Sequence, residues 1–121
     1  MGEISDYRKE LKNRIIDYAM CEFYKRGIKA VKMDEISRGL HVSKRTVYEL
    51  FGDKEELLLA GLKESHMKMH KELETYASNK AHNVIDIIGY YYRLQMDVNG
   101  LVGVSFYEEV HRIPRVVSYF K

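Results

Sequence analysis

The sequence predicts an all-α protein, and three features of its 121 residues support this fold class. Apolar side chains recur every three or four residues along most of the chain, which is the spacing of one face of an α-helix. Breaks in that pattern fall at Gly27, Ser78-Asn79 and Asn99-Gly100, where helices are expected to end. The apolar fraction is 45%, with ten Tyr and four Phe, which is enough to form a packed core.

The stretch from Met33 to Lys54 organises the chain. Its first part predicts a short helix, because small or apolar residues stand at positions i, i+3, i+4 and i+7. These residues are Met33, Ile36, Ser37 and Leu40. His41-Val42-Ser43 interrupts the pattern, and Ser43 is a favourable N-cap for a second helix over residues 44–51. Two short helices joined by such a turn form a helix-turn-helix, whose second helix enters the major groove of DNA.

The first helical turn after Ser43 carries side chains that can donate hydrogen bonds to DNA. Lys44, Arg45 and Thr46 come first, and Tyr48 follows. Such donors suit phosphate oxygens and guanine edges. Charge supports DNA binding only mildly, since the net charge is +2 and residues 1–54 hold 12 Lys and Arg against 9 Asp and Glu. The placement of the donors is therefore more informative than the total charge.

A helix is expected ahead of this motif, from Asp6 as a plausible N-cap to Arg26, with Gly27 following as a C′ residue. Its apolar residues repeat every four positions, at Leu11, Ile15, Ala19 and Phe23. Cys21, the only cysteine, lies in this amphipathic segment. We expect it to be a small, inert and partly buried residue rather than a redox sensor.

Residues 14–58 resemble the DNA-binding domain of the TetR family of bacterial transcriptional regulators. Many positions of different chemical type match in one order and spacing, so the resemblance is more specific than a generic helix-turn-helix. The matching residues are Ile15, Ala19 and Phe23, then Gly27, Ile36, Val42-Ser43, Thr46-Val47-Tyr48, Phe51, Lys54 and Leu57-Leu58. The resemblance implies a three-helix DNA-binding domain over residues 1–54 and a helical ligand-binding and dimerisation domain over residues 55–121. It also implies a ligand-responsive repressor that binds double-stranded DNA, at a palindromic operator, as a homodimer in its full-length form.

The resemblance further implies two kinds of DNA contact. Lys44 and Arg45 would read bases, because both are long donors at the start of the recognition helix. The side chains expected at phosphates are those of Lys32, Ser43, Thr46, Tyr48 and Lys54. Two alternatives stay open, since Tyr48 could be purely structural and Glu49 could either accept from a cytosine or face solvent.

The chain departs from the family pattern at three places, one of which is Arg45, where a small residue is common. Val31 and Lys32 stand where Thr commonly caps the second helix, so this cap is expected to be weaker or shifted. His41 stands where Gly is usual, and a backbone with positive φ suits His less well. A bent but intact turn is therefore expected there.

A fourth helix is expected over residues 55–76, begun by a capping box of Asp53 and Glu56. Lys54 would sit at this helix start, where its ammonium and the free N–H groups together form an anion site. The next helix, over residues 81–98, is apolar on most sides and should be buried among other helices. Two short helices follow, over residues 105–112 and, begun by Pro114, over residues 115–121. The last apolar stripe lacks a later helix to cover it, so we expect domain 55–121 to be a truncated, N-terminal part of the ligand-binding domain. An unusually short family member is the alternative.

Aromatic and methionine side chains in this second domain suit a pocket for an unknown small-molecule effector. The candidate lining residues are Met67, Tyr91, Tyr92, Met96, Phe106 and Tyr107. Ordinary core packing is the alternative for each of them.

Other site classes find little support. Glu108 and His111 have the Glu-x-x-His spacing of di-iron bundles, and His66 and His70 lie one turn apart, but no second Glu-x-x-His exists. Because a di-iron site needs two copies, we expect no metal and no cofactor. We expect no enzyme either, since the sequence contains no Gly-rich phosphate loop, Cys/His dyad or serine elbow. The absence of a signal peptide and of a long apolar run predicts a cytoplasmic protein without a membrane partner.

Overall fold

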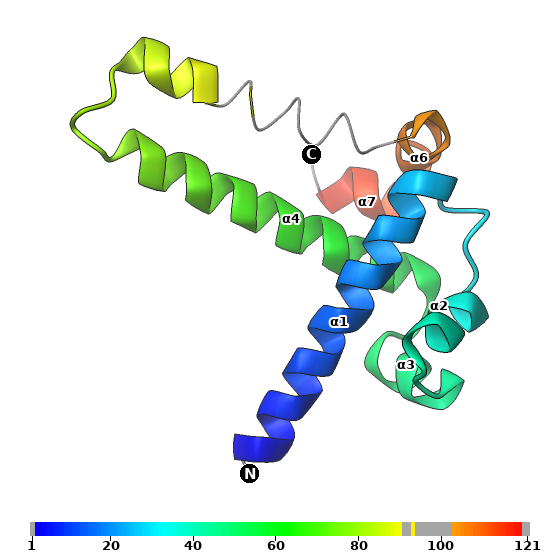
Figure 1. The fold of residues 1–121 in the computed structure, drawn as a ribbon. Coiled ribbons are helices and arrows are strands. Elements are labelled where there is room, and N and C mark those ends of the chain that lie inside the picture. Colours follow the sequence, from blue (N-terminus) through cyan, green and yellow to red (C-terminus); the bar gives the residue numbers. More distant parts are fainter. Residues whose placement is uncertain (1, 91–92, 94–102, 120–121) are drawn as a thin grey trace.

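The computed structural model describes residues 2–90, 93 and 103–119, and every regular element in these residues is helical. Figure 1 shows their arrangement. The elements are α1 (Gly2–Arg26), α2 (Met33–Leu40), α3 (Lys44–Leu50), α4 (Lys54–Ala77), α6 (Val104–Val110) and α7 (Pro114–Tyr119), with a further helical segment over residues 84–90. The predicted all-α fold class is confirmed.

Helix α1 is longer than predicted. It begins at Gly2, so Asp6 lies inside the helix and is not its N-cap. Residues 3–5 contain neither Pro nor Gly, and an acidic residue at position 3 suits a helix N-terminus, so the helix extends past the first strong capping residue. The helix ends where expected, because Gly27 has a left-handed backbone with φ 89° and its N–H donates to the Phe23 carbonyl over 2.8 Å.

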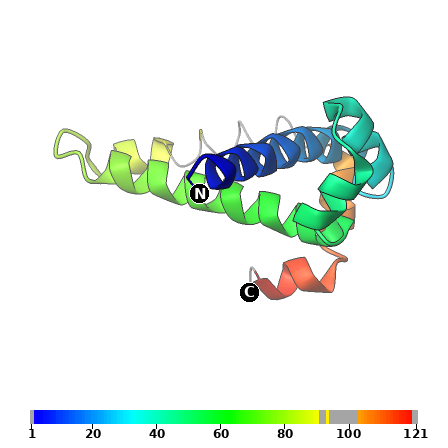
Figure 2. The same cartoon turned by 90° about the horizontal axis from the view of Figure 1, so that it is seen from below.

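The core lies where α1 crosses the N-terminal part of α4, with α2 and α3 beside the crossing (Figures 1 and 2). Its fully buried side chains come from all four helices and the loop between α1 and α2. They are Ile15, Phe23, Val31, Ile36, Val47, Leu57 and Leu58. The crossing is close, since a Cβ on Gly61 of α4 would lie 2.4 Å from Cγ of Met20 on α1. A glycine at position 61 therefore lets the two helix backbones approach.

Helix α6 packs against the C-terminal end of α1, and α7 packs against α4. Phe106 and Val116 are buried, and the Phe106 ring meets the Tyr24 ring edge-on with centroids 4.8 Å apart. The Gly103 N–H donates to the Tyr24 carbonyl over 2.8 Å. Pro114 begins α7, as predicted. Residues 103–119 thus brace the helix that supports the helix-turn-helix.

The end of α4 and the segment that follows it extend away from the core (Figure 1). Ser78 caps α4, which confirms the predicted break. The prediction of a buried helix over residues 81–98 is wrong for its described part, because Val84 and Ile85 are 70% and 79% exposed. On one side of the segment, Tyr90 stacks on Tyr76 of α4 with ring centroids 4.1 Å apart. Among the described residues, Val84, Ile85 and Ile88 remain exposed.

Cys21 is exposed, so the expectation of a partly buried thiol is wrong. Ala19 and Phe23 face the core. Cys21 lies two residues from each of them, which is a rotation of about 200° around the helix, so its side chain points away from the core. None of the helices in the described part of the chain has a segment long and apolar enough to span a membrane.

Candidate nucleic-acid interface

The turn between α2 and α3 is intact, as predicted. His41 has the left-handed backbone that the motif requires, with φ 57° and ψ 39°. The His41 N–H donates to the Arg38 carbonyl over 3.2 Å, and the Val42 N–H donates to the Ser37 carbonyl over 3.0 Å. This pair of bonds is the Schellman motif, which satisfies the last free carbonyls of α2 and tolerates His in place of the usual Gly.

Helix α3 begins at a side-chain cap. Ser43 Oγ accepts from the Thr46 N–H over 3.1 Å, and the two hydroxyl oxygens of Ser43 and Thr46 lie 2.7 Å apart as a further hydrogen bond. The predicted N-cap is therefore confirmed. Val47 is fully buried and anchors the helix, while Phe51 is its C-cap rather than its last helical residue. The cap and the anchor hold the first turn of α3 rigidly at the surface.

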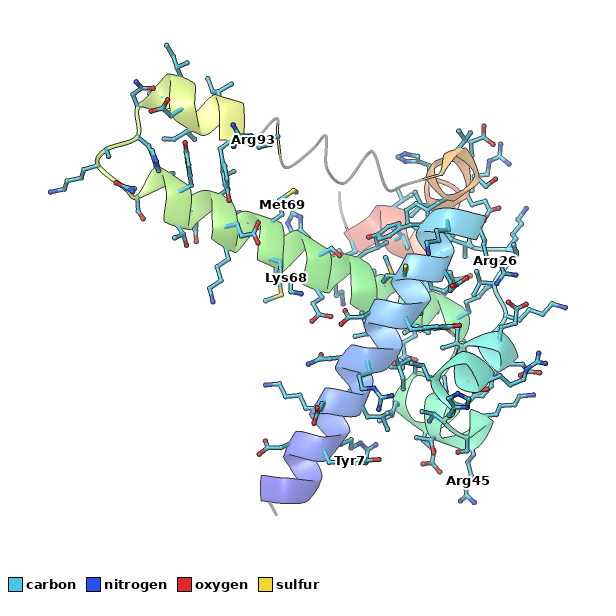
Figure 3. The ribbon with its side chains drawn as sticks, viewed as in Figure 1. Tyr7, Arg26, Arg45, Lys68, Met69 and Arg93 are labelled. Carbon is cyan, nitrogen blue, oxygen red and sulfur yellow. The ribbon has the colours of Figure 1, made fainter. Side chains whose placement is uncertain are left out.

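The two candidate base readers are exposed on that turn. The Arg45 side chain is 89% exposed, and its Nε lies 3.0 Å from Oε1 of Glu49. Lys44 Nζ lies 3.0 Å from Oδ1 of Asp34 on α2, and this hydrogen bond raises the pKa of Lys44. Figure 3 shows Arg45 at the extremity of the molecule, pointing away from the other helices. Glu49 faces solvent and pairs with Arg45. The side chains of Lys44 and Arg45 therefore both remain exposed.

The candidate phosphate contacts surround this turn. Lys32 is exposed and occupies the N-cap position of α2 without making a side-chain cap, which confirms the weak cap expected there. Tyr48 is 42% exposed, and Thr46 is half-buried beside Ser43. These groups lie on the exposed side of the helix-turn-helix or at its start.

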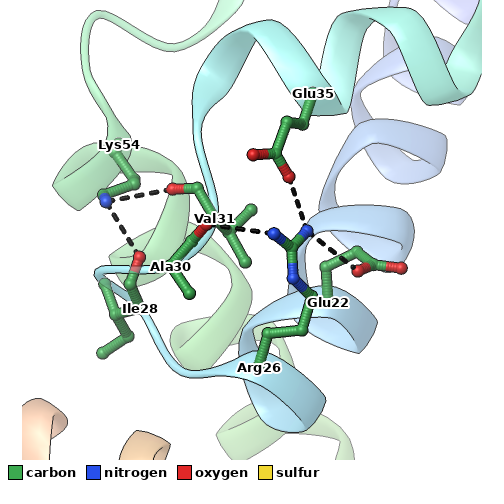
Figure 4. Close-up of polar contacts among 7 residues, drawn as sticks. All are labelled: Glu22, Arg26, Ile28, Ala30, Val31, Glu35 and Lys54. Carbon is green, nitrogen blue, oxygen red and sulfur yellow. Dashed lines mark hydrogen bonds and ion pairs between the residues drawn. The ribbon is translucent and has the colours of Figure 1, made fainter.

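Lys54 is the exception among the predicted phosphate contacts. Its Nζ donates to the carbonyls of Ile28 and Val31, over 2.8 and 3.0 Å, and burial lowers the pKa of Lys54 (Figure 4). The expected exposed ammonium at the start of α4 is therefore not found. The N-terminus of α4 is instead capped by Asp53, whose Oδ1 accepts from the Glu56 N–H over 2.7 Å. Glu56 completes a shifted capping box by accepting from the Gly52 N–H over 2.8 Å.

The comparison with protein families agrees with this geometry. Residues 15–60 match the family described as bacterial regulatory proteins, tetR family. The match runs from α1 through α2 and α3 into the first turns of α4, which are the elements that carry the core and the helix-turn-helix.

Residues 15–60 form a TetR-family DNA-binding domain. The resemblance seen in the sequence over residues 14–58 is thereby confirmed, and the chain is a DNA-binding transcriptional regulator. Comparisons with curated proteins and with solved structures found no match.

Sequence reasoning missed an ion cluster inside the TetR domain. The Arg26 guanidinium bonds to Glu35 of α2, donates to the Ala30 carbonyl over 3.1 Å, and lies 3.5 Å from Glu22 (Figure 4). Arg26 looked like an ordinary charge in the last turn of α1. The i,i+4 spacing indicates Glu22, but no spacing rule could have found Glu35, which is nine residues away across a loop.

This cluster predicts a pH dependence of stability. The hydrogen bond from Arg26 lowers the pKa of Glu35 below its ordinary value of 4.5. The stabilisation is fully present above pH 4.5 and is lost as the pH falls through the lowered pKa. Glu35→Gln should therefore lower the melting temperature near neutral pH, and the difference from the unmodified protein should shrink as the pH falls from 4.5 through the lowered pKa of Glu35. Thermal melts over this pH range check it, with the exposed Glu72→Gln on α4 as control; a difference independent of pH would contradict the assignment.

A second feature missed from the sequence is the position of Tyr7 on α1. Tyr7 and Arg8 line a shallow pocket together with Thr46 and Glu49 of α3. Tyr7 is 68% exposed and is labelled in Figure 3 on the same side of the molecule as Arg45. The N-terminal part of α1 therefore lies beside the recognition helix of the TetR domain and adds donors there.

The predicted effector pocket finds little support in the described residues. Met67 is 67% exposed on α4, whereas Phe106 is buried against Tyr24 as part of the core. Tyr91, Tyr92 and Met96 lie outside the described residues, as does the side chain of Tyr107. An open pocket near the end of α4 is lined by other residues: Lys71, Glu72, Thr75, Tyr76, Asn79, His82 and Tyr90.

The histidines of α4 lie on its exposed side. His66 and His70 are exposed and their rings stack with centroids 6.5 Å apart. His70 Nε2 lies 3.4 Å from Glu74. Within the described part of the chain, no group of three or more His, Cys, Asp or Glu is placed to hold a metal ion.

Proposed function

We propose that this TetR-family regulator is a cytoplasmic repressor that binds a palindromic operator as a homodimer and responds to a small-molecule effector. The observation that supports this best is the first turn of α3, which is capped by Ser43, anchored by Val47 and exposed at Arg45. A rigid helix with exposed donors at its N-terminus is what major-groove recognition requires.

Base selection is assigned to Lys44 and Arg45. Lys44 and Arg45 form exposed ion pairs with Asp34 and Glu49, respectively. Exposed pairs contribute little to folding stability, so exchanging them for contacts with DNA costs little free energy. Arg45 can then present two N–H groups to the O6 and N7 atoms of a guanine.

Affinity is assigned to phosphate contacts from Lys32, Ser43, Thr46 and Tyr48. Such contacts carry no sequence information, but they set the register of the domain on the duplex. The hydroxyl pair of Ser43 and Thr46 retains acceptor and donor capacity that can be redirected to a phosphate. Tyr7 and Arg8 of α1 extend the same surface.

The homodimer follows from how little DNA a single TetR domain can read. One recognition helix contacts a few base pairs, and two domains related by a two-fold axis would read two half-sites of a palindrome about one helical turn apart. Residues 55–121, which include most of α4, would supply the ligand-binding part, with Tyr91, Tyr92, Met96 and Tyr107 as the remaining candidates for contact with the effector.

Selection from a random duplex library tests the operator. We expect the chain to enrich a palindromic duplex, with a binding constant whose logarithm falls with log salt by about 0.9 per phosphate contacted. The double variant Lys44→Ala, Arg45→Ala should lose the enrichment. The control Lys80→Ala, Arg112→Ala removes the same charge from exposed positions outside the helix-turn-helix and should keep it. Enrichment of no duplex would contradict operator binding by this chain, and an enriched duplex without symmetry would contradict the dimer.

A further inference from the structure

The loop between α1 and α2, residues 27–32, is held by side chains from outside it. Ile28 and Val31 offer their carbonyls to Lys54 of α4, and Ala30 offers its carbonyl to Arg26 of α1. The Lys29 N–H donates to Glu109 Oε2 of α6 over 2.8 Å. Figure 4 shows Lys54 and Arg26 bound to the loop from opposite sides. Three helices therefore determine where this loop lies.

Lys54 makes the largest share of these bonds. Its ammonium is half-buried and donates to two carbonyls three residues apart in the sequence. The burial that lowers the pKa of Lys54 is opposed first by the charge of Glu109 and then by those of Glu35 and Glu55. A charged donor held between two carbonyl acceptors is a strong clamp, because charge-assisted hydrogen bonds are stronger than neutral ones.

The clamp acts directly on the start of α2. Lys32 follows Val31 and is the N-cap residue of α2, yet its own side chain makes no capping bond. The Lys32 carbonyl accepts from the N–H groups of Glu35 and Ile36 over 3.0 and 3.3 Å. The position of Lys32 therefore depends on the loop and not on a local cap, while Arg26 also holds the first turn of α2 through Glu35.

We propose that Lys54 is a positioning residue for DNA binding: by clamping the carbonyls of Ile28 and Val31, it places Lys32 at the phosphate backbone, and it does not contact phosphate itself. This inference rests on the proposed phosphate contact of Lys32. It assigns Lys54 a different role from the direct anion contact that its place at a helix N-terminus first indicated.

A double-variant cycle separates the two roles. The probe is a duplex enriched by the unmodified chain, and the measured quantity is the slope of log binding constant against log salt. Lys32→Ala and Lys54→Met should each reduce the steepness of the slope by about 0.9 for each bound subunit, the value for one phosphate contact. Because Lys54 acts through Lys32, the double variant should lose the same amount as either single variant and not the sum of the two. A double-variant loss about twice that of Lys32→Ala, or no change in Lys54→Met alone, would overturn the proposal.

A measurement on the unmodified protein covers the case in which Lys54→Met fails to fold. With ¹⁵N in the lysine side chains, NMR detects scalar coupling across hydrogen bonds from Lys54 Nζ to its acceptor. In the complex with a duplex of mixed sequence, we expect coupling to the carbonyl carbons of Ile28 and Val31. Coupling to ³¹P, or loss of both carbonyl couplings on binding, would overturn the clamp. This readout needs no operator, so it stands even if the library enriches nothing and the proposed operator binding fails.

Discussion

Phe23→Ala is expected to lower the free energy of unfolding by about 3 to 5 kcal/mol. The Phe23 side chain is fully buried where α1 crosses α4, among side chains from all four helices of the TetR domain. Removing the ring forfeits its transfer free energy and leaves a cavity that close-packed neighbours cannot fill. A domain of this size has a total stability of about 5 to 15 kcal/mol, so the variant should be only marginally folded at 37 °C.

Urea denaturation followed by circular dichroism measures this change. Tyr7→Ala is the matched control, because it also truncates an aromatic residue on α1, but one that is 68% exposed. The control should alter stability by less than about 0.5 kcal/mol. A Phe23→Ala midpoint as high as that of the Tyr7→Ala protein would contradict the core described at this crossing.

Arg45→Ala is expected to reduce discrimination at one base pair of each half-site by about 1 to 3 kcal/mol, which is the value of a bidentate contact with a base. The Arg45 side chain is 89% exposed and its partner Glu49 is exposed as well, so folding should be unaffected. The affinity for the enriched duplex should therefore fall while the melting temperature stays the same.

Competition among duplexes that each carry one substituted base pair measures the effect. In the Arg45→Ala protein one position should become tolerant of all four bases, while other positions keep their preference. Arg112→Ala, which removes an exposed arginine that follows α6, should change no position. Equal losses of affinity on the enriched duplex and on random DNA would instead assign Arg45 to phosphate.

Much of the helix-turn-helix could be predicted because its determinants are local. The Ser43 cap acts on an N–H three residues away, and Gly27 ends α1 through its own backbone angle. The weak cap at Lys32 and the intact turn at His41 also followed from single residues compared with the usual pattern. Signals of this kind extend over three or four residues, which is the range of a helical turn.

The predictions that failed concerned where side chains point and which elements cover them. Cys21 lies on an amphipathic helix, but the direction of the core decides that it is exposed. The segment 84–90 is apolar, yet its exposure depends on what packs over it. For Phe106 the sequence left a ligand pocket and the core as alternatives, and its burial beside Tyr24 favours the core.

Local sequence signals indicated the all-α fold class, the TetR-family DNA-binding domain, and α3 as its recognition helix with Lys44 and Arg45 at the exposed start. These properties depend on spacing and capping within a few residues. Only the fold shows the acceptors of Lys54, which lie 26 and 23 residues earlier, and the donor to Glu109, which is an amide 80 residues away. The physical reason is that a charged side chain binds whichever acceptor the fold brings within about 3 Å, and sequence spacing does not specify that acceptor.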